Sequence, residues 1–294
     1  DRVASRGLGD VYKRQGFISK NSIQLSMNHR ILIALLFTSS SISGCLGVME
    51  EHSEDTGDLP MLEDPCMIPS APLTQSLASI EVNGVEREFR LSVPSSDPGT
   101  SLPLVIAFHG GTDSQEDFAQ QEQFDQLGEQ EKFVMAYAIA EQDRTAAEGE
   151  WFLNTAATSK EDNNLAEAIV DELSDSYCIN QDRLYAIGYS LGAMFTYEIA
   201  CQLNHRFAAT ASFAGTMPVN PETCDITSGI AILHIHGKLD YIIYYHQDWD
   251  WKDGEHEGVG TMSEVPNLID YWAAKSSCQA NSVETSLTEE HITH

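Results

Sequence analysis

The stretch Leu184-Tyr185-Ala186-Ile187-Gly188-Tyr189-Ser190-Leu191-Gly192 joins an apolar run to a serine flanked by glycines. The run over 184–189 predicts a buried strand, and apolar residues at three- and four-residue spacing over 191–203 predict a helix. A serine between such a strand and helix lies on a sharp turn that raises its hydroxyl above the sheet. We therefore predict that Ser190 is a nucleophile; the alternative is a glycine-rich turn without chemistry.

Similar segments recur on both sides of this turn. Residues 79–93 predict a hairpin around Asn83-Gly84, because this dipeptide favours a tight turn. Further strands are predicted at 104–108, 133–138, 230–235 and, more weakly, 208–213, and further helices at 114–130, 162–176 and 263–275. Strands that alternate with helices predict an α/β fold of three layers, with a doubly wound, mostly parallel sheet. The hairpin adds antiparallel strands at the N-terminal edge.

The charge balance limits the partners of the protein. The chain has 45 acidic and 16 basic residues, for a net charge of -29. Such a surface repels nucleic acid and anionic lipid head groups, so we exclude both as partners. Solubility in salty water explains the charge, and an acidic surface that binds a partner protein is the alternative. We expect a monomer.

The N-terminal region has the order of a targeting segment. Residues 27–44 contain a basic start, a short apolar run and small residues, which together predict a signal peptide. The ending Ile42-Ser43-Gly44-Cys45 looks like a bacterial lipobox, which implies lipidation of Cys45 and, with Leu46 after it, the outer membrane of a Gram-negative cell. The alternative is an ordinary signal peptide with a chance cysteine. Residues 1–26 are interpreted as upstream or non-native sequence.

The remaining chain divides into two parts. Residues 45–65 are acidic and contain few large apolar groups, so they predict a flexible tether. Residues 66–294 are predicted to form one α/β domain, incomplete at its C-terminus, and they hold Cys66, Cys178, Cys201, Cys224 and Cys278. Export permits disulfides, and the odd number predicts an unpaired thiol or a missing partner. The sequence has no Cys-x-x-Cys spacing, so we expect no metal and no cofactor.

A glycine-rich loop follows the strand at 104–108. Its residues His109-Gly110-Gly111-Thr112 stand where hydrolases with a nucleophilic serine form one half of the oxyanion hole. We predict that the backbone amides of Gly111 and Leu191 bind the oxyanion, with Thr112 as a less favoured donor. His109 is expected to support the loop.

The acid of a catalytic triad is predicted after a later strand. Asp240 follows the run at 230–235 and fits the chain order of serine, then acid, then histidine. Its carboxylate would orient the imidazole of the base; the alternative is an aspartate of a surface turn. His234 and His236 are expected to point to opposite faces of their strand and to pack there.

Three separate groups of residues resemble one family. They are the string from Cys178 to Met194, Arg206-Phe207-Ala208-Ala209 with Ala214-Gly215-Thr216-Met217-Pro218, and His234-Ile235-His236-Gly237-Lys238-Leu239-Asp240. The chain from 78 to 280 resembles the polyhydroxybutyrate depolymerases and feruloyl esterases, which implies the α/β-hydrolase fold and ester hydrolysis. That family places its histidine base in a glycine-rich segment ending His-Thr-Trp-Pro-Gly, which this sequence lacks. We therefore expect that the chain is truncated and that the base is absent, with His291 and His294 as weaker candidates.

The substrate region is predicted from aromatic residues. Residues 244–258 are expected to form a loop over the active site that also contains His246 and His256. Trp249 and Trp251 in this loop are candidates to contact the acyl group, and a solvated insertion is an equal alternative. Trp151 is a further candidate, for which an aromatic packed beside the sheet is at least an equal alternative. The predicted function is a serine carboxylic-ester hydrolase that acts on a polyester or on feruloyl or acetyl esters. The alternatives are a peptidase or thioesterase of the same fold and a non-catalytic surface lipoprotein.

Overall fold

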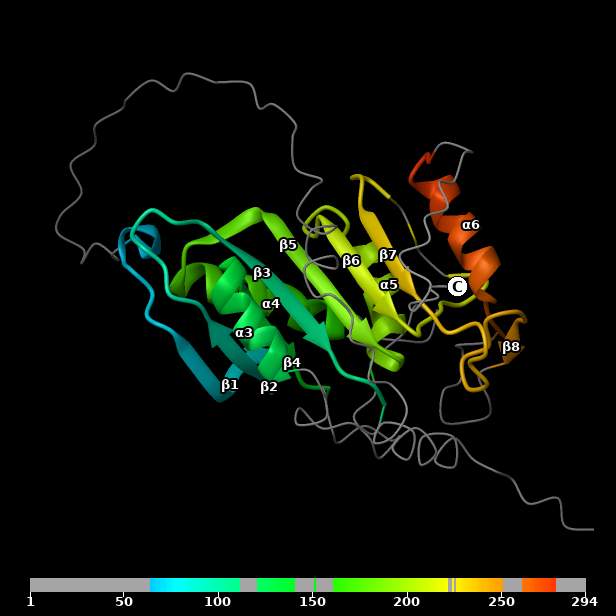
Figure 1. Cartoon of the computed structure of the whole chain (residues 1–294), viewed down its shortest axis with the longest axis horizontal. Helices are drawn as coiled ribbons and strands as arrows, with labels where there is room; N and C mark the ends of the chain where they lie inside the picture. Colours follow the sequence, from blue (N-terminus) through cyan, green and yellow to red (C-terminus); the bar gives the residue numbers. More distant parts are fainter. Residues whose placement is uncertain are drawn as a thin grey trace, which may run out of the picture.

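A computed structural model has a mixed sheet of seven strands (Figure 1), and the Ser190 turn directly follows one of them. The structure describes residues 64–111, 121–140, 151, 161–221, 224, 226–250 and 261–278. The strands are β1 (Leu73–Val82), β2 (Val85–Val93), β3 (Leu102–Phe108), β4 (Val134–Ala138), β5 (Ile179–Tyr189), β6 (Ala209–Phe213) and β7 (Ala231–Ile235), with the short β8 (Trp249–Asp250) and β9 (Thr261–Met262) outside the sheet. The helices are η1 (Pro65–Met67), α3 (Gln121–Glu131), α4 (Glu161–Ser176), α5 (Leu191–Gln202) and α6 (Val265–Lys275).

The strand order is β1-β2-β4-β3-β5-β6-β7, which confirms the predicted doubly wound sheet. The strands from β4 to β7 are parallel, whereas β1 and β2 pair antiparallel with their neighbours. The hairpin turns at Asn83 and Gly84, which have φ of 54° and 83°. Positive φ is the reason that Asn-Gly suits this turn. The predicted antiparallel edge is therefore confirmed.

Both faces of the sheet are buried, because alternate side chains enter separate cores. Leu104, Ile106 and Phe108 of β3 join the larger core with residues of α4, α5 and α6. Val105 and Ala107 join the smaller core with Leu127 of α3. This arrangement explains the uninterrupted apolar runs, since a strand covered on both faces has no solvent-facing position. The three predicted layers are confirmed.

The structure differs from the predicted local structure in two segments, 244–258 and 114–130. The segment at 244–258 is not wholly a loop, because Trp249 pairs with Met262 in the two-stranded sheet of β8 and β9. A run of only two strand residues is too short for sequence alternation to reveal. The helix predicted at 114–130 is described only from Gln121, and it continues to Glu131. The weaker strand prediction at 208–213 is confirmed as β6.

Two disulfides connect distant parts of the chain. Cys66 pairs with Cys178 across a sequence separation of 112 residues, and Cys201 pairs with Cys224. Among the residues described, Cys278 is an exposed free thiol, in agreement with the odd number of cysteines. The same part of the chain contains no helix long and apolar enough to cross a membrane.

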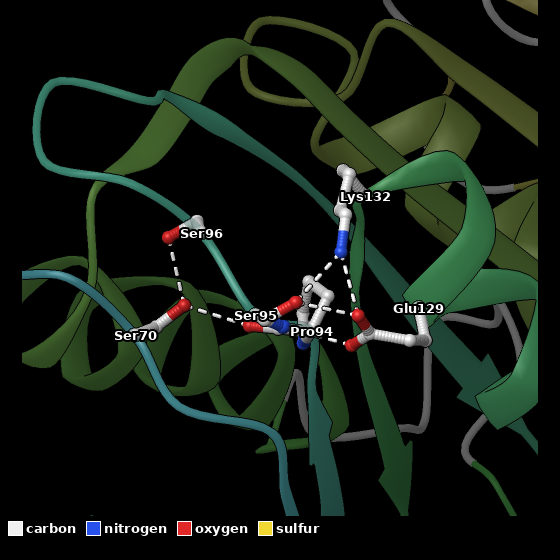
Figure 2. A network of polar contacts seen from close by, with 6 residues as sticks. All are labelled: Ser70, Pro94, Ser95, Ser96, Glu129 and Lys132. Atoms are coloured by element: carbon white, nitrogen blue, oxygen red, sulfur yellow. Dashed lines mark hydrogen bonds and ion pairs between the residues drawn. The ribbon is translucent and has the colours of Figure 1, made fainter.

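A polar network joins the segment after β2 to the end of α3 and to Lys132, just before β4 begins (Figure 2). The Glu129 carboxylate accepts hydrogen bonds from the Ser95 amide at 2.8 Å and from the Lys132 ammonium at 2.6 Å. The hydrogen bonds from Lys132 and Ser95 lower the pKa of Glu129 to about 2. Ser70 extends the network by donating to the carbonyl oxygen of Pro94 at 2.7 Å. The predicted active site lies at the opposite ends of the parallel strands, their carboxyl ends, because Ser190 follows β5.

Candidate active site

Ser190 lies at the point where β5 ends and α5 begins. Its backbone has φ 54° and ψ -118°, a conformation that a residue with a Cβ adopts only under strain. The Ser190 amide donates to the carbonyl of Phe213 at 2.9 Å, and the Ser190 carbonyl accepts from Met194 at 3.0 Å. These bonds hold the turn between the sheet and the helix. Strain at this one position is the geometry expected of a nucleophile on a strand-to-helix turn.

The two flanking glycines permit this turn to close. A Cβ on Gly188 would lie 2.2 Å from the carbonyl oxygen of Gly192. A Cβ on Gly192 would lie 2.1 Å from the carbonyl oxygen of Phe108 and 2.4 Å from that of His109. No side chain can occupy either space. The close approach of Gly192 therefore brings the first turn of α5 directly against the end of β3, where the predicted oxyanion loop begins.

The loop after β3 is held by the His109 imidazole. The Ala140 amide donates to His109 Nε2 at 3.1 Å, so this nitrogen carries no proton, and Nδ1 lies 2.7 Å from the carbonyl oxygen of Gly110. His109 is therefore the neutral Nδ1–H tautomer, with both ring nitrogens in structural contacts. This agrees with the supporting role expected of His109. Gly111 and Leu191 are both buried, and Leu191 directly precedes Gly192, which closely approaches the carbonyl oxygens of Phe108 and His109.

Trp151 packs beneath this loop. Its side chain is 3% exposed, and its indole N–H donates to the carbonyl of His109 at 2.9 Å. The ring stacks against Phe195 of α5 and meets Phe108 edge to face. Of the two interpretations of Trp151, these contacts favour the packed aromatic over a wall of the substrate site.

The predicted acid follows a strand that ends beside the Ser190 turn. The Ser190 amide bonds to Phe213 of β6, and in the same way the Ala214 amide bonds to Ile235 of β7 at 2.8 Å. Positions 190, 214 and 236 therefore lie side by side. With neighbouring strands about 4.8 Å apart, the backbones at 190 and 236 are separated by roughly 10 Å. The loop that contains Asp240 starts at this point.

The Asp240 carboxylate is fixed by several contacts. Its Oδ1 accepts from the amides of Ile242 at 2.9 Å and Ile243 at 3.0 Å, and its Oδ2 lies 3.5 Å from Nε2 of His236. Burial would raise the pKa of Asp240, but the hydrogen bonds from His236 and the two amides outweigh burial and lower it. Asp240 is therefore a charged, oriented carboxylate, as an acid that holds an imidazole must be.

The prediction that His234 and His236 point to opposite faces is wrong. Their rings stack with centroids 5.3 Å apart, because residues two positions apart in a strand share a face. The side chain of His234 shares a hydrogen bond of 2.6 Å with the Tyr197 hydroxyl of α5. Burial, and secondarily the charge of His236, lowers the pKa of His234 to about 3. The two-residue spacing was the signal that could have revealed this pair.

The other predicted site residues are placed as follows. Trp249 lies in β8, partly buried against the larger core. His246 is exposed and meets the ring of Tyr245 edge to face. The remaining predictions lie outside the described residues; they concern Cys45, Thr112, Trp251, His256, His291 and His294.

Relatives of this chain are esterases by name. A protein of Nocardia uniformis subsp. tsuyamanensis that is named as an esterase, NocK, is 29% identical over 229 residues, which are 76% of this chain and 64% of the relative. A bifunctional acetylxylan esterase/xylanase of Neocallimastix patriciarum is 26% identical over 165 residues, which are 56% of this chain and 23% of the relative. The chain thus spans less than two thirds of the length of either relative.

A solved structure shares the fold. The crystal structure of a thermostable esterase matches with a TM-score of 0.51 and 18% identity, over 74% of this chain and 53% of the other. The phospholipase/carboxylesterase family matches residues 94–252, from the end of β2 to the segment after β8. This range is more than half of the chain and includes Ser190, the loop after β3 and Asp240. The protein is therefore an α/β-hydrolase that belongs to the phospholipase/carboxylesterase family.

Proposed function

We propose that this protein hydrolyses carboxylic esters through an acyl-enzyme on Ser190. The observation that carries the proposal is the backbone of Ser190, with φ 54° at the junction of β5 and α5. A fold tolerates such strain in a residue other than glycine where the surrounding structure demands it, and such positions cluster at active sites. The family match supports ester hydrolysis as the class of reaction.

In the proposed reaction, Ser190 Oγ attacks the ester carbonyl carbon while a histidine base accepts the hydroxyl proton. The amides of Gly111 and Leu191 donate to the oxyanion of the tetrahedral intermediate. Collapse of the intermediate breaks the C–O bond, and the leaving alkoxide takes the proton from the imidazolium. Water then attacks the acyl-enzyme by the same route and releases the acid. Asp240 orients the base and stabilises its charged form.

A fluorophosphonate probe tests the nucleophile directly, because it labels only an activated serine. In a form of the protein that contains the histidine base, we expect labelling on Ser190 and none of Ser190→Ala. The matched control is Ser79→Ala, which removes an exposed hydroxyl on β1 and should label like the parent. Absence of labelling, or labelling that survives Ser190→Ala, would overturn the proposal in favour of a non-catalytic scaffold.

Within this chain, His291 and His294 are the weaker candidates for the base of the proposed triad. Replacing each with asparagine and following p-nitrophenyl acetate hydrolysis separates them, since loss of the base lowers kcat by about 10⁴-fold or more. If neither variant changes the rate, both candidates are eliminated. His246→Asn belongs in the same series, because this exposed histidine also follows Asp240.

The substrate proposed is an acetyl, feruloyl or aliphatic polyester bond. The resemblance of residues 78–280 and the acetylxylan esterase activity in the name of one relative support this range. Acetylated xylan, methyl ferulate and a short polyhydroxybutyrate oligomer, compared by kcat/KM, discriminate among the three. Hydrolysis of a peptide or thioester substrate in preference to all three would contradict it.

The proposed location is the outer membrane, through a lipid on Cys45. Metabolic labelling with a palmitate analogue should mark the protein in a Gram-negative host, and Cys45→Ser should abolish the mark. Release of unlabelled protein into the medium by the parent chain would indicate an ordinary signal peptide.

A further inference from the structure

A column of buried side chains connects α5, which begins at the nucleophile, with the loop that holds Asp240. Tyr197 of α5 shares a 2.6 Å hydrogen bond with His234 Nδ1, and the His234 ring stacks on that of His236. The His236 side chain is 0% exposed, and Tyr245 meets its ring edge to face with centroids 5.8 Å apart. The rings of His234 and Tyr245 therefore hold the imidazole of His236, in addition to its polar contacts.

The proton of His236 has a defined position. Nε2 lies 2.9 Å from the carbonyl oxygen of Ile243, which can only accept, so Nε2 must donate. The buried Nδ1 has no hydrogen-bond partner within the described part of the chain. A proton on Nδ1 would leave a buried donor unsatisfied, at a cost of about 1–3 kcal/mol. Neutral His236 is therefore the Nε2–H tautomer.

This single N–H contacts two residues of the loop after β7, Asp240 and Ile243. It donates to the carbonyl of Ile243 and faces Oδ2 of Asp240 at 3.5 Å. The Ile243 amide in turn donates to Oδ1 of the same carboxylate at 3.0 Å. Rotation of the Asp240 carboxylate would disturb the contacts of both oxygens at once. Among the described residues, Oδ2 has one long contact, to His236, and so keeps lone pairs free to accept a hydrogen bond from a base.

We propose that His236 is a positioning residue that fixes the orientation of the Asp240 carboxylate through the Nε2–H tautomer. This proposal rests on the proposed function, in which Asp240 is the acid. His236 is not the base, because its ring is buried and its only proton donates to the backbone. His234 and Tyr197 act behind it and keep its ring in place.

The tautomer is measured first, in the intact protein, by ¹⁵N–¹H correlation of the imidazole at neutral pH. We expect the chemical-shift pattern of an Nε2–H imidazole for His236, assigned by its loss in His236→Gln. The Nδ1–H pattern, or rapid exchange between the two tautomers, would overturn the proposal. This readout does not depend on turnover.

Kinetics of two variants then test the role. His236→Leu removes the donor at similar volume, and we expect kcat to fall by about 100-fold, as misplacement of a catalytic group does, with KM nearly unchanged. His236→Gln places an amide donor near the position of Nε2, and it should recover much of the loss. His205→Gln, at an exposed site before β6, is the control and should behave like the parent. A loss in KM alone, or no rescue by glutamine, would contradict positioning.

A double-mutant cycle with Asp240→Asn separates positioning from a general effect on folding. If His236 acts only through Asp240, adding His236→Leu to Asp240→Asn should lower kcat by less than about 3-fold, because residues that act as a unit are not additive. Full multiplication of the two losses would sink the proposal. If Ser190→Ala remains active, the proposed function fails instead. If Ser190 and Asp240 are essential but His236→Leu is active, only the positioning proposal fails.

Discussion

Gly192 and Phe108 approach each other so closely that a Cβ on the glycine would lie 2.1 Å from the carbonyl oxygen of the phenylalanine. This contact joins the first turn of α5, which follows Ser190, to the end of β3. The obstructing atom belongs to the backbone of a central strand, so it cannot rotate away as a side chain could. The site therefore depends on the absence of a single carbon atom.

Gly192→Ala should destabilise the protein and disable the site together. The added Cβ forces α5 away from β3, at a cost of about 3 kcal/mol for overpacking, and separates the Leu191 amide from the loop of Gly111. Urea unfolding and fluorophosphonate labelling measure the two effects. Gly229→Ala is the matched control, because a Cβ at Gly229 meets no atom within 4 Å. Equal stability of the two variants would show that the helix moves at little cost.

Ser190→Gly should be more stable than the parent although it has no nucleophile. Glycine adopts φ 54° without the clash of a Cβ, which relieves strain of about 1–3 kcal/mol. The greater freedom of glycine in the unfolded chain lowers the free energy of unfolding by up to about 1 kcal/mol. We therefore expect the free energy of unfolding to rise by about 1 kcal/mol in total and the Tm to rise by about 2–4 °C. Ser190→Ala keeps the Cβ and should not show this gain in calorimetry. A lower Tm for the glycine variant would contradict strain at this residue.

The buried ion pair of Arg87 and Asp162 should matter far more than an exposed one. The two side chains are 3% and 0% exposed and lie 3.0 Å apart, joining β2 to α4. Asp162→Ala leaves a buried guanidinium uncompensated and should cost about 3–5 kcal/mol in urea unfolding. Asp171→Ala removes the partner of Arg206 in a pair of which the carboxylate is 67% exposed, and it should change stability by less than about 1 kcal/mol. Similar losses in both variants would contradict the role of burial.

Acidification should destabilise the fold through His234. Burial lowers the pKa of His234 from its ordinary 6.5 to about 3, so between these pH values the unfolded chain binds a proton that the folded protein does not. Stability from this residue is complete above pH 6.5 and is lost progressively as the pH falls toward 3. In the described part of the chain, the ring contacts Tyr197 and His236, and neither supplies a negative charge to compensate.

The measurement is the free energy of unfolding in urea at pH 7, 5.5 and 4. His234→Phe should flatten its dependence on pH over this range, whatever its stability at pH 7. An unchanged slope would assign the acid sensitivity to carboxylates, of which Glu129 is one, with a pKa of about 2. Because Glu129 titrates below an ordinary value of 4.5, its contribution is lost at a lower pH than that of His234.

Much of the fold follows from local patterns. Continuous apolar runs marked β3, β4 and the second half of β5, because strands covered on both faces have no polar positions. The run at 230–235 also predicted β7, although most residues of this strand are only partly buried. Asn83-Gly84 marked the hairpin because its backbone requires positive φ. The short β8 and β9 escaped prediction, since two-residue strands carry no period and depend on pairing between distant residues.

The sequence by itself determined the strand-to-helix turn of Ser190 and its flanking glycines, and so the prediction of a nucleophile there, because the steric demands of a sharp turn act within five consecutive residues. It also determined Asp240 as a candidate acid, through the order of motifs along the chain. Only the tertiary structure decided how the Asp240 carboxylate is held, by His236 and by the backbone amides of Ile242 and Ile243. Tyr197 and His234 are 37 residues apart in the chain, and their contact arises only when α5 packs against the sheet. Local chemistry can be predicted from neighbours in sequence, whereas orientation depends on side chains that folding brings together.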